Sequence, residues 1–300
     1  MADTQRPSNP RRLRELIARG TVVLPGAFNA LTAMQIERAG FDAVYVSGAG
    51  IAAVRGLPDI GLLSMAEVVA DAGTIAQAVA IPALADADTG YGPPLSVMRT
   101  VQAFEQAGLA GIHLEDQESP KKCGHLPDKR LVSVAEMAQK IGAAVGARRD
   151  PDFLIVARTD ARAVEGLDGA VKRARAYVDV GADVVFPEAL ESAEEFKAFA
   201  HALNKEGVTV PLVANMTEFG KTPYLTVKEF EALGYRLVLF PVTALRVAAR
   251  AIEALLEELK SLGTQQRSLD KMQTRQRLYE LLRYAEYEKR DDDIEKWYGR

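Results

Sequence analysis

Eight short, β-branched runs alternate with longer amphipathic stretches along this chain, and that alternation constrains the fold more than any other feature of the sequence. The runs lie at residues 21–24, 43–46, 81–86, 111–116, 153–158, 183–188, 211–215 and 236–241. Runs this apolar are typical of strands covered on both faces, and helices between them imply parallel pairing through crossover connections. Eight such units over about 240 residues favour an α/β fold of the (β/α)8 TIM-barrel type over an open doubly wound sheet. No GxGxxG follows the first run, which argues further against a dinucleotide-binding fold.

The chain continues past the point where such a barrel is complete. One closing helix is enough, yet a second helical region at about 264–295 follows a barrel core of about 10–262. Its apolar positions need a surface to cover, on its own barrel or on a neighbouring subunit: Leu278, Leu281, Leu282 and Tyr284. A simple extra surface helix is the alternative. We therefore expect a single barrel domain over residues 1–300 with an additional C-terminal helical segment and frayed ends.

Composition narrows the class of protein. Of the 300 residues, 48% are hydrophobic and 26% charged, which is enough to bury a sizeable core. A net charge of -4, with Lys and Arg spread along the chain, gives no electrostatic reason to bind nucleic acid. The first residues lack an apolar segment followed by a cleavage site, and no apolar stretch runs unbroken for about 18 residues. These features predict a cytoplasmic protein with no nucleic-acid or membrane partner.

Polar residues gather where the predicted strands end, and in a barrel the loops at that face form the active site. They follow six of the runs: Tyr45-Val46-Ser47-Gly48, Asp86-Ala87-Asp88, Glu115-Asp116, Arg158-Thr159-Asp160, Glu188 and Asn215-Met216-Thr217. Polar residues end strands in many proteins. Six sets together, four of them with carboxylates, favour one shared pocket.

Two of these carboxylates indicate a metal site. Asp86 and Asp88 are two positions apart, so an extended backbone would point both side chains to the same side. With Glu115 from the next strand they form an all-oxygen set without a thiolate, which suits a hard ion that keeps several waters, Mg2+ or Mn2+. The alternative is that Asp86 or Asp88 merely caps the helix that follows. Arg158 offers a planar donor pair for a substrate carboxylate, although it could instead pair with Glu188.

The segment Lys121-Lys122-Cys123-Gly124-His125 holds the only cysteine of the chain. The two lysines and a protonated His125 would favour the thiolate form of Cys123. Flanking Pro120 and Pro127 indicate an ordered but movable loop that could act as a lid. A lone cysteine is usually structural, but one in a charged loop is poorly suited to filling a core, which favours catalysis. His113 is expected in the core or just behind the pocket, and His201 in solvent.

These motifs together resemble the bacterial 2-methylisocitrate lyase family, within the isocitrate lyase and phosphoenolpyruvate mutase superfamily. The resemblance runs from about residue 10 to 295 and rests on YVSGAG, GLPDIG, DADTGYG, HLEDQ, KKCGH, ARTDA, FPEA, NMTEFG, FPVTALR and MQTRQRLYE. KKCGH combined with DAD and ARTDA is specific for the branch that cleaves carbon–carbon bonds.

The resemblance implies cleavage of (2S,3R)-2-methylisocitrate to pyruvate and succinate with Mg2+, in the methylcitrate route of propionate breakdown. It implies that Cys123 protonates the succinate carbanion, that Lys122 and His125 tune or orient it, and that Tyr45 is a plausible base. It implies direct metal ligation by Asp86 and Asp88, with Asp59 and Glu115 acting through waters. The positions that match substrate-side residues of the family are Ser47, Gly48, Ala49, Cys123, Gly124, Arg158, Glu188, Asn215, Met216, Thr217, Arg246 and Arg275.

The resemblance also implies a homotetramer whose C-terminal helices are exchanged between subunits. Within the superfamily, isocitrate lyase, 2,3-dimethylmalate lyase and oxaloacetate hydrolase share the loop, and the MQTRQRLYE ending favours the methylisocitrate branch. One methyl group discriminates by only about 1–3 kcal/mol, so minor activity on isocitrate is expected. A non-catalytic barrel scaffold would lack the Asp pair, Cys123 or Arg158, and all of these are present.

Overall fold

The barrel expected from the sequence is present in a computed structural model that describes residues 7–299. All eight predicted strands form, each within two or three residues of its expected bounds, and all pair in parallel. They are β1 (Val22–Ala27), β2 (Val44–Val46), β3 (Ala83–Asp86), β4 (Gly111–Glu115), β5 (Leu154–Thr159), β6 (Val184–Pro187), β7 (Val213–Asn215) and β8 (Leu237–Phe240).

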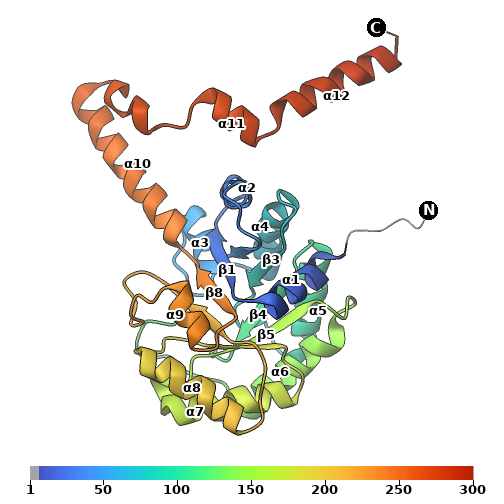
Figure 1. Ribbon diagram of the computed structural model, residues 1–300, viewed down its shortest axis with the longest axis vertical. Coiled ribbons are helices and arrows are strands. Elements are labelled where there is room, and N and C mark those ends of the chain that lie inside the picture. Colours follow the sequence, from blue (N-terminus) through green and yellow to red (C-terminus); the bar gives the residue numbers. More distant parts are fainter. Residues whose placement is uncertain (1–6, 300) are drawn as a thin grey trace. The chain divides into compact units, whose positions relative to one another are not determined.

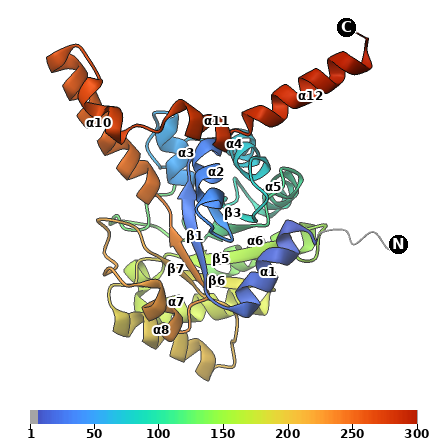
Figure 2. The same cartoon turned by 45° about the horizontal axis from the view of Figure 1, so that its top comes forward.

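The strands close on themselves. Their order is β6-β5-β4-β3-β2-β1-β8-β7, and a parallel bridge between Val185 and Leu212 joins β6 to the chain leading into β7. Figures 1 and 2 show the strands in the middle with α5 to α8 outside them. Because all the strands are parallel, their carboxyl ends meet at one end of the barrel, where the active site was predicted.

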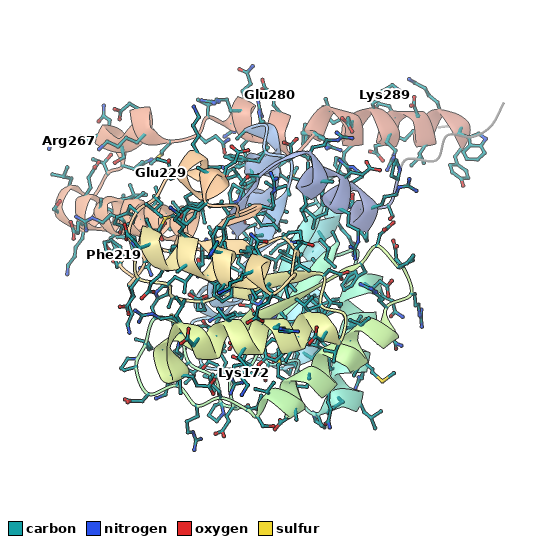
Figure 3. The ribbon with its side chains drawn as sticks, turned by 60° about the horizontal axis from the view of Figure 1, so that its bottom comes forward. Lys172, Phe219, Glu229, Arg267, Glu280 and Lys289 are labelled. Carbon is teal, nitrogen blue, oxygen red and sulfur yellow. The ribbon has the colours of Figure 1, made fainter. Side chains whose placement is uncertain are left out.

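Helices follow the strands in the expected alternation. In the barrel they are α1 (Asn9–Arg19), α2 (Ala30–Arg38), α3 (Gly48–Val54), α4 (Met65–Gln77), α5 (Pro94–Gln106), α6 (Val134–Ala147), α7 (Arg162–Asp179), α8 (Ala193–Lys205) and α9 (Val227–Ala232). Several begin at a hydroxyl cap, as at Ser64 and Thr226, where a glutamate three residues on completes a capping box. Charged side chains such as Lys172 of α7 and Glu229 of α9 cover the outside (Figure 3). No helix within residues 7–299 is long and apolar enough to cross a membrane.

The barrel interior is filled by side chains. Leu13 and Ile17 of α1 are buried in one cluster with inward-facing strand residues that include Leu24, Phe186 and Leu237. Two further clusters lie between the strands and the outer helices, one over the first half of the chain and one over the second. Since burying each large apolar side chain contributes about 1.5–3 kcal/mol, these layers hold the strand ends in fixed positions.

The chain divides into two compact units, the barrel up to Leu245 and a second unit from Arg246 onward. Helix α10 (Thr243–Leu262) crosses the boundary, and the second unit also contains η1 (Gln266–Lys271), α11 (Arg275–Leu281) and α12 (Tyr284–Trp297). The expectation of one continuous helix through Tyr284 is wrong, because Arg283 adopts a left-handed conformation with φ 55° that ends the helical path after α11. Residues 266–271, within the expected helical region, form a 3-10 helix. The extent of a single domain stays a prediction.

Candidate active site

Side chains from the ends of five neighbouring strands form two sets of polar contacts. Arg158 of β5 lies 3.3 Å from Glu115 of β4 and 3.4 Å from Glu188 after β6. Asn215 of β7 donates to both Glu188 carboxylate oxygens at 3.2 Å. On the other side, His113 of β4 lies 3.6 Å from Asp86 of β3. These side chains, which were predicted to share one pocket, therefore lie close together at the carboxyl end of the barrel, and their role in binding stays a prediction.

Arg158 is the centre of this pocket. Its guanidinium donates to both oxygens of Asp160, at 2.9 and 3.2 Å, and lies 5.2 Å from the Phe186 ring centroid. Burial lowers the pKa of Arg158, but Asp160, Glu115 and Glu188 outweigh it and raise the pKa well above the ordinary value. Arg158 is therefore a fixed positive charge, held between the carboxylates of Asp160, Glu115 and Glu188.

Glu188 is the negatively charged partner of Arg158. Burial raises the pKa of Glu188, but the Arg158 guanidinium and the contact with His125 lower it overall, below its usual range. The pairing of Arg158 with Glu188, which the sequence left as the structural alternative, is thus real. The same guanidinium also pairs with Asp160 through its Nε, while Glu188 lies at its Nη1.

The predicted metal ligands lie together, but by a different geometry from the one expected. Strand β3 ends at Asp86, and Asp88 has φ 46°, in the left-handed region, so the two carboxylates are not placed by an extended backbone. Instead the Asp88 backbone N–H donates to Asp86 Oδ1 at 2.9 Å in a tight turn. Gly48 lies directly against this turn, because a Cβ at Gly48 would come within 2.7 Å of Asp86 Oδ2.

Lys121 lies among these carboxylates. Its ammonium pairs with Asp88 at 2.8 Å and with Asp59 more closely still. Burial lowers the pKa of Lys121, yet Asp88, Glu115, Asp86 and Asp59 together raise it well above the usual value. From the sequence, Lys121 was expected only to influence Cys123. Its position among the carboxylates was not predicted, because a lysine near a cysteine in the sequence gives no signal of its distant partners.

The acidic set fits a hydrated cation. Burial raises the pKa values of Asp86, Asp88 and Glu115, so added positive charge would be favourable there. One Glu115 oxygen, Oε1, is buried without a hydrogen-bond partner. Within residues 7–299 no group of three or more His, Cys, Asp or Glu side chains is arranged so that it could hold a metal ion as the side chains stand. An oxygen-rich site that leaves several waters on the ion is what Mg2+ prefers.

Tyr45 and His113 form a buried pair behind the carboxylates. The Tyr45 hydroxyl lies 2.8 Å from His113 Nε2, and the two rings stack at 5.9 Å. Burial and then Arg158 lower the pKa of His113 to about 3, so it is neutral. Burial and Asp86 raise the pKa of Tyr45 well above 10.0, so its phenol is protonated in this arrangement. The placement of His113 in the core agrees with expectation, and the base role of Tyr45 stays a prediction.

The Cys123 loop docks onto this pocket. Gly124 contacts Arg158 and Glu188 so closely that a Cβ there would collide with both side chains. His125 Nε2 lies 3.0 Å from Glu188 Oε1, and its Nδ1 accepts from the Lys221 backbone N–H at 3.1 Å. Cys123 itself is a free, exposed thiol.

The basic neighbours of Cys123 bind elsewhere. Lys122 donates to the Asp128 backbone carbonyl at 3.1 Å, Lys121 pairs with Asp88, and His125 contacts Glu188. Each of these three side chains thus has a partner of its own, and their expected influence on Cys123 stays a prediction.

The remaining predicted residues divide into two groups. Ser47 caps α3 by accepting from the Gly50 backbone N–H at 3.1 Å, with Gly48 and Ala49 in the first turn beside Asp86. Met216 is buried after β7, with Thr217 next to it. Arg246 and Arg275 belong to the second unit, and His201 is exposed on α8 as expected.

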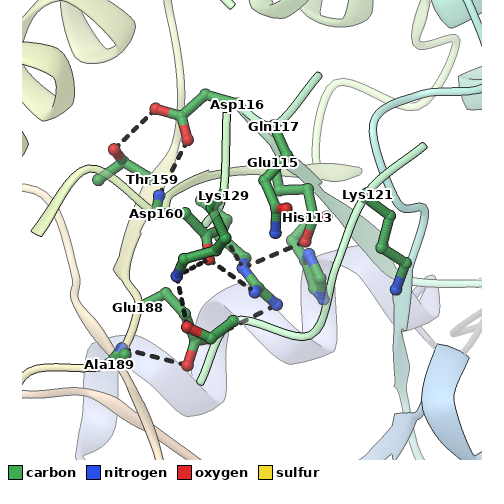
Figure 4. A network of polar contacts seen from close by, with 12 residues as sticks. His113, Glu115, Asp116, Gln117, Lys121, Lys129, Thr159, Asp160, Glu188 and Ala189 are labelled. Atoms are coloured by element: carbon green, nitrogen blue, oxygen red, sulfur yellow. Dashed lines mark hydrogen bonds and ion pairs between the residues drawn. The ribbon is translucent and has the colours of Figure 1, made fainter. Parts of the chain in front are cut away.

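Lys129 was missed by the sequence analysis, and Asp116 and Asp160 were named there only as polar residues at strand ends. Lys129 is buried and pairs with Asp160 at 2.8 Å, and Asp116 accepts from the Asp160 backbone N–H at 2.9 Å. Figure 4 shows Asp116 linked to Thr159 and Asp160, with Lys129 and Glu188 beside them. Asp116 and Asp160 lie at predicted strand ends, which is a weak indication of a functional role. Lys129 lies in a polar loop, where the sequence gives no such indication.

The chain is similar to known proteins over most of its length. The model of the phosphoenolpyruvate phosphomutase family matches residues 13–260. The chain is 51% identical to a 2-methylisocitrate lyase of Aeropyrum pernix over 285 residues, 95% of this chain and 90% of the relative. It is 54% identical to a probable 2-methylisocitrate lyase of Corynebacterium glutamicum over 271 residues, 90% of this chain and 88% of the relative.

Solved structures are similar over the same extent. Oxaloacetate acetylhydrolase in complex with 3,3-difluorooxalacetate has a TM-score of 0.90 and 36% identity, covering 96% of this chain and 97% of that one. Phosphonopyruvate hydrolase in complex with oxalate and Mg2+ has a TM-score of 0.86 and 30% identity, covering 98% and 100%.

Proposed function

Since this chain belongs to the phosphoenolpyruvate phosphomutase family, we propose that it cleaves (2S,3R)-2-methylisocitrate to pyruvate and succinate. This is the carbon–carbon lyase step of the methylcitrate cycle of propionate breakdown. The observation that carries the proposal is the docking of the Cys123 loop, through Gly124 and His125, onto the Arg158–Glu188 pair. The two relatives, at 51% and 54% identity, support the choice of substrate.

The chemistry is a retro-aldol cleavage. A base removes the proton of the substrate hydroxyl, the oxygen forms the carbonyl of pyruvate, and the broken C–C bond leaves its electron pair on the succinate fragment. The Cys123 thiol then gives its proton to that carbanion, and the proton held by the base restores the thiol. Proton transfer from a positioned side chain contributes about 100-fold to 10,000-fold in such steps.

The fixed charges of the pocket would orient the substrate. Arg158 is held flat by Asp160 and presents its guanidinium toward the loop, where it would bind a substrate carboxylate. Glu188 and Asn215, which are hydrogen-bonded to each other, would contact the hydroxyl side. The further substrate contacts that we propose come from Ser47, Gly48, Ala49, Gly124, Met216, Thr217, Arg246 and Arg275. Lys122 and His125 would orient the thiol.

Mg2+ is the proposed cofactor, with Mn2+ as a substitute. Asp86 and Asp88 would hold it directly, and Asp59 and Glu115 through waters. This assignment is supported by the burial that raises the pKa values of Asp86 and Asp88, and by the buried Glu115 oxygen that has no hydrogen-bond partner. When bound, such an ion stabilises negative charge that develops on the 2-hydroxy acid end of the substrate. The similar phosphonopyruvate hydrolase structure contains oxalate and Mg2+, which supports this assignment.

We further propose a homotetramer in which C-terminal helices are exchanged between subunits. The described part of the second unit has several exposed apolar side chains, including Tyr279, Leu282 and Ile294. A second copy of the chain would cover them at little extra ordering cost. Location in the cytoplasm also stays a prediction.

A substrate panel tests the function. Purified protein with Mg2+ would be assayed for release of oxo acid from methylisocitrate, isocitrate, 2,3-dimethylmalate and oxaloacetate, with and without excess chelator. We expect the highest kcat/KM for methylisocitrate and loss of activity in chelator. A higher kcat/KM for any of the other three acids would overturn the proposed substrate. Full activity in chelator would reject the metal.

A further inference from the structure

Lys129 is a buried cation that has no role in the reaction described so far. It lies in the loop that carries Cys123, only 6% exposed, although its neighbours Asp128 and Arg130 are exposed. A lysine is almost never buried unless it is paired. Its position therefore calls for partners inside the protein.

Those partners join the loop to the barrel. Lys129 Nζ donates to the backbone carbonyl of Gly124, within the loop itself, and to Asp160 Oδ1 at 2.8 Å, at the end of β5. Asp160 Oδ1 also accepts from Arg158 at 3.2 Å. One carboxylate oxygen thus receives a donor from the loop and a donor from the guanidinium that we propose binds substrate.

Asp160 is a rigid anchor for both. Its backbone N–H donates to Asp116 Oδ1 at 2.9 Å, and the other Asp116 oxygen accepts from Thr159 and Tyr177 at 2.7 and 2.8 Å. All of these side chains are buried or nearly so. The anchor does not depend on the loop, because Asp116 is held by residues of β5 and α7.

We infer that Lys129 is a positioning residue that holds the Cys123 loop in place over Arg158, with Asp160 as its anchor. The inference rests on the proposed function for its effect on catalysis, but its structural part concerns the loop alone. Fixing Gly124 fixes the backbone next to Cys123, and so the place from which the thiol reaches a substrate carbanion. Because Arg158 keeps Asp160 as a partner when Lys129 is removed, substrate binding should be affected less than turnover.

The test compares Lys129→Met with Arg130→Met in the full-length protein. Arg130 is next in the chain and its exposed side chain pairs with Glu118, 3.1 Å away, so the control removes the same charge from the same loop. Hydrogen–deuterium exchange would be followed at residues 118–131, where Leu126 N–H donates to the Cys123 carbonyl at 2.9 Å. We expect exchange at Lys122 to Leu126 to be about tenfold faster in Lys129→Met and unchanged in Arg130→Met, because a bond to a charged group is lost.

Turnover provides the second readout. With whichever acid the wild type cleaves, we expect kcat to fall about tenfold or more in Lys129→Met, with KM changed by less than about threefold. Unchanged exchange in the loop would overturn the inference, and so would faster exchange with an unchanged kcat. If Lys129→Met does not fold, as judged by circular dichroism, Lys129→Gln gives the same comparison with a neutral donor retained. A wild type that cleaves none of the four acids would remove the proposed function, while the exchange experiment would still decide whether Lys129 holds the loop.

Discussion

Replacing Asp116 by Asn should destabilise the barrel at the end of β5 and shows how much of the site depends on a residue that touches no substrate. The Asp116 carboxylate accepts from the Asp160 backbone N–H, the Thr159 hydroxyl and the Tyr177 hydroxyl, at 2.9, 2.7 and 2.8 Å. Arg173 adds a longer contact at 3.3 Å. The Asn side chain keeps one acceptor oxygen for Asp160 and replaces the other with an NH2 group.

The magnitude follows from the donors left without an acceptor. Each buried donor that loses its partner costs about 1–3 kcal/mol, and Thr159 and Tyr177 both lose theirs. Arg173 adds less, because it retains Glu165 at 2.6 and 2.8 Å and the Val132 carbonyl at 2.9 Å. The expected loss in the free energy of unfolding is therefore about 2–6 kcal/mol, which spans the range of about 3–5 kcal/mol for breaking a buried ion pair.

Urea unfolding followed by circular dichroism measures this loss. Tyr177→Phe is the matched control, since it removes one hydroxyl and leaves Asp116 charged, and we expect it to cost about 1 kcal/mol. The reasoning is refuted if Asp116→Asn costs no more than Tyr177→Phe, because the network would then contribute nothing beyond one hydrogen bond.

Three other outcomes follow from the site. Cys123→Ser should lower kcat at least about 100-fold while substrate binding by calorimetry is retained, because the proton donor is lost and Arg158 remains; wild-type turnover would remove Cys123 from the mechanism. Asp86→Ala and Asp88→Ala should each raise the Mg2+ concentration needed for half-maximal activity about tenfold or more, read from metal titrations, and an unchanged requirement would exclude both as ligands. Deleting residues 264–300 should give a smaller species by light scattering and impair cleavage; a tetrameric, active truncated protein would contradict the proposed exchange of helices.

The fold was predictable because its signal is local. Each strand is a short apolar run and each helix an amphipathic stretch with its own cap, so eight repeats identify a barrel and the strand ends identify a pocket. The grouping of Arg158, Glu188 and Asn215 followed directly from that topology.

What could not be predicted depends on tertiary partners. The left-handed conformation of Asp88 and the burial of Lys121 among carboxylates arise from loops that meet only in the folded barrel. In the sequence, Lys129 cannot be distinguished from a solvated surface lysine, because it lies between the charged residues Asp128 and Arg130. The break at Arg283 has no glycine or proline to announce it, so the pattern around it reads as a continuous helix.

The filled interior of the barrel has a kinetic consequence. Leu13 and Ile17 are buried in one cluster with Leu24 and Phe186, so side chains of the described residues fill the barrel interior. We therefore expect both products to leave at the carboxyl-end mouth. Two fragments that leave through one opening beneath one loop depart in sequence. We expect an ordered release in which the last product to leave is a competitive inhibitor against substrate and the first is noncompetitive, and steady-state inhibition patterns with pyruvate and succinate would reveal which is which.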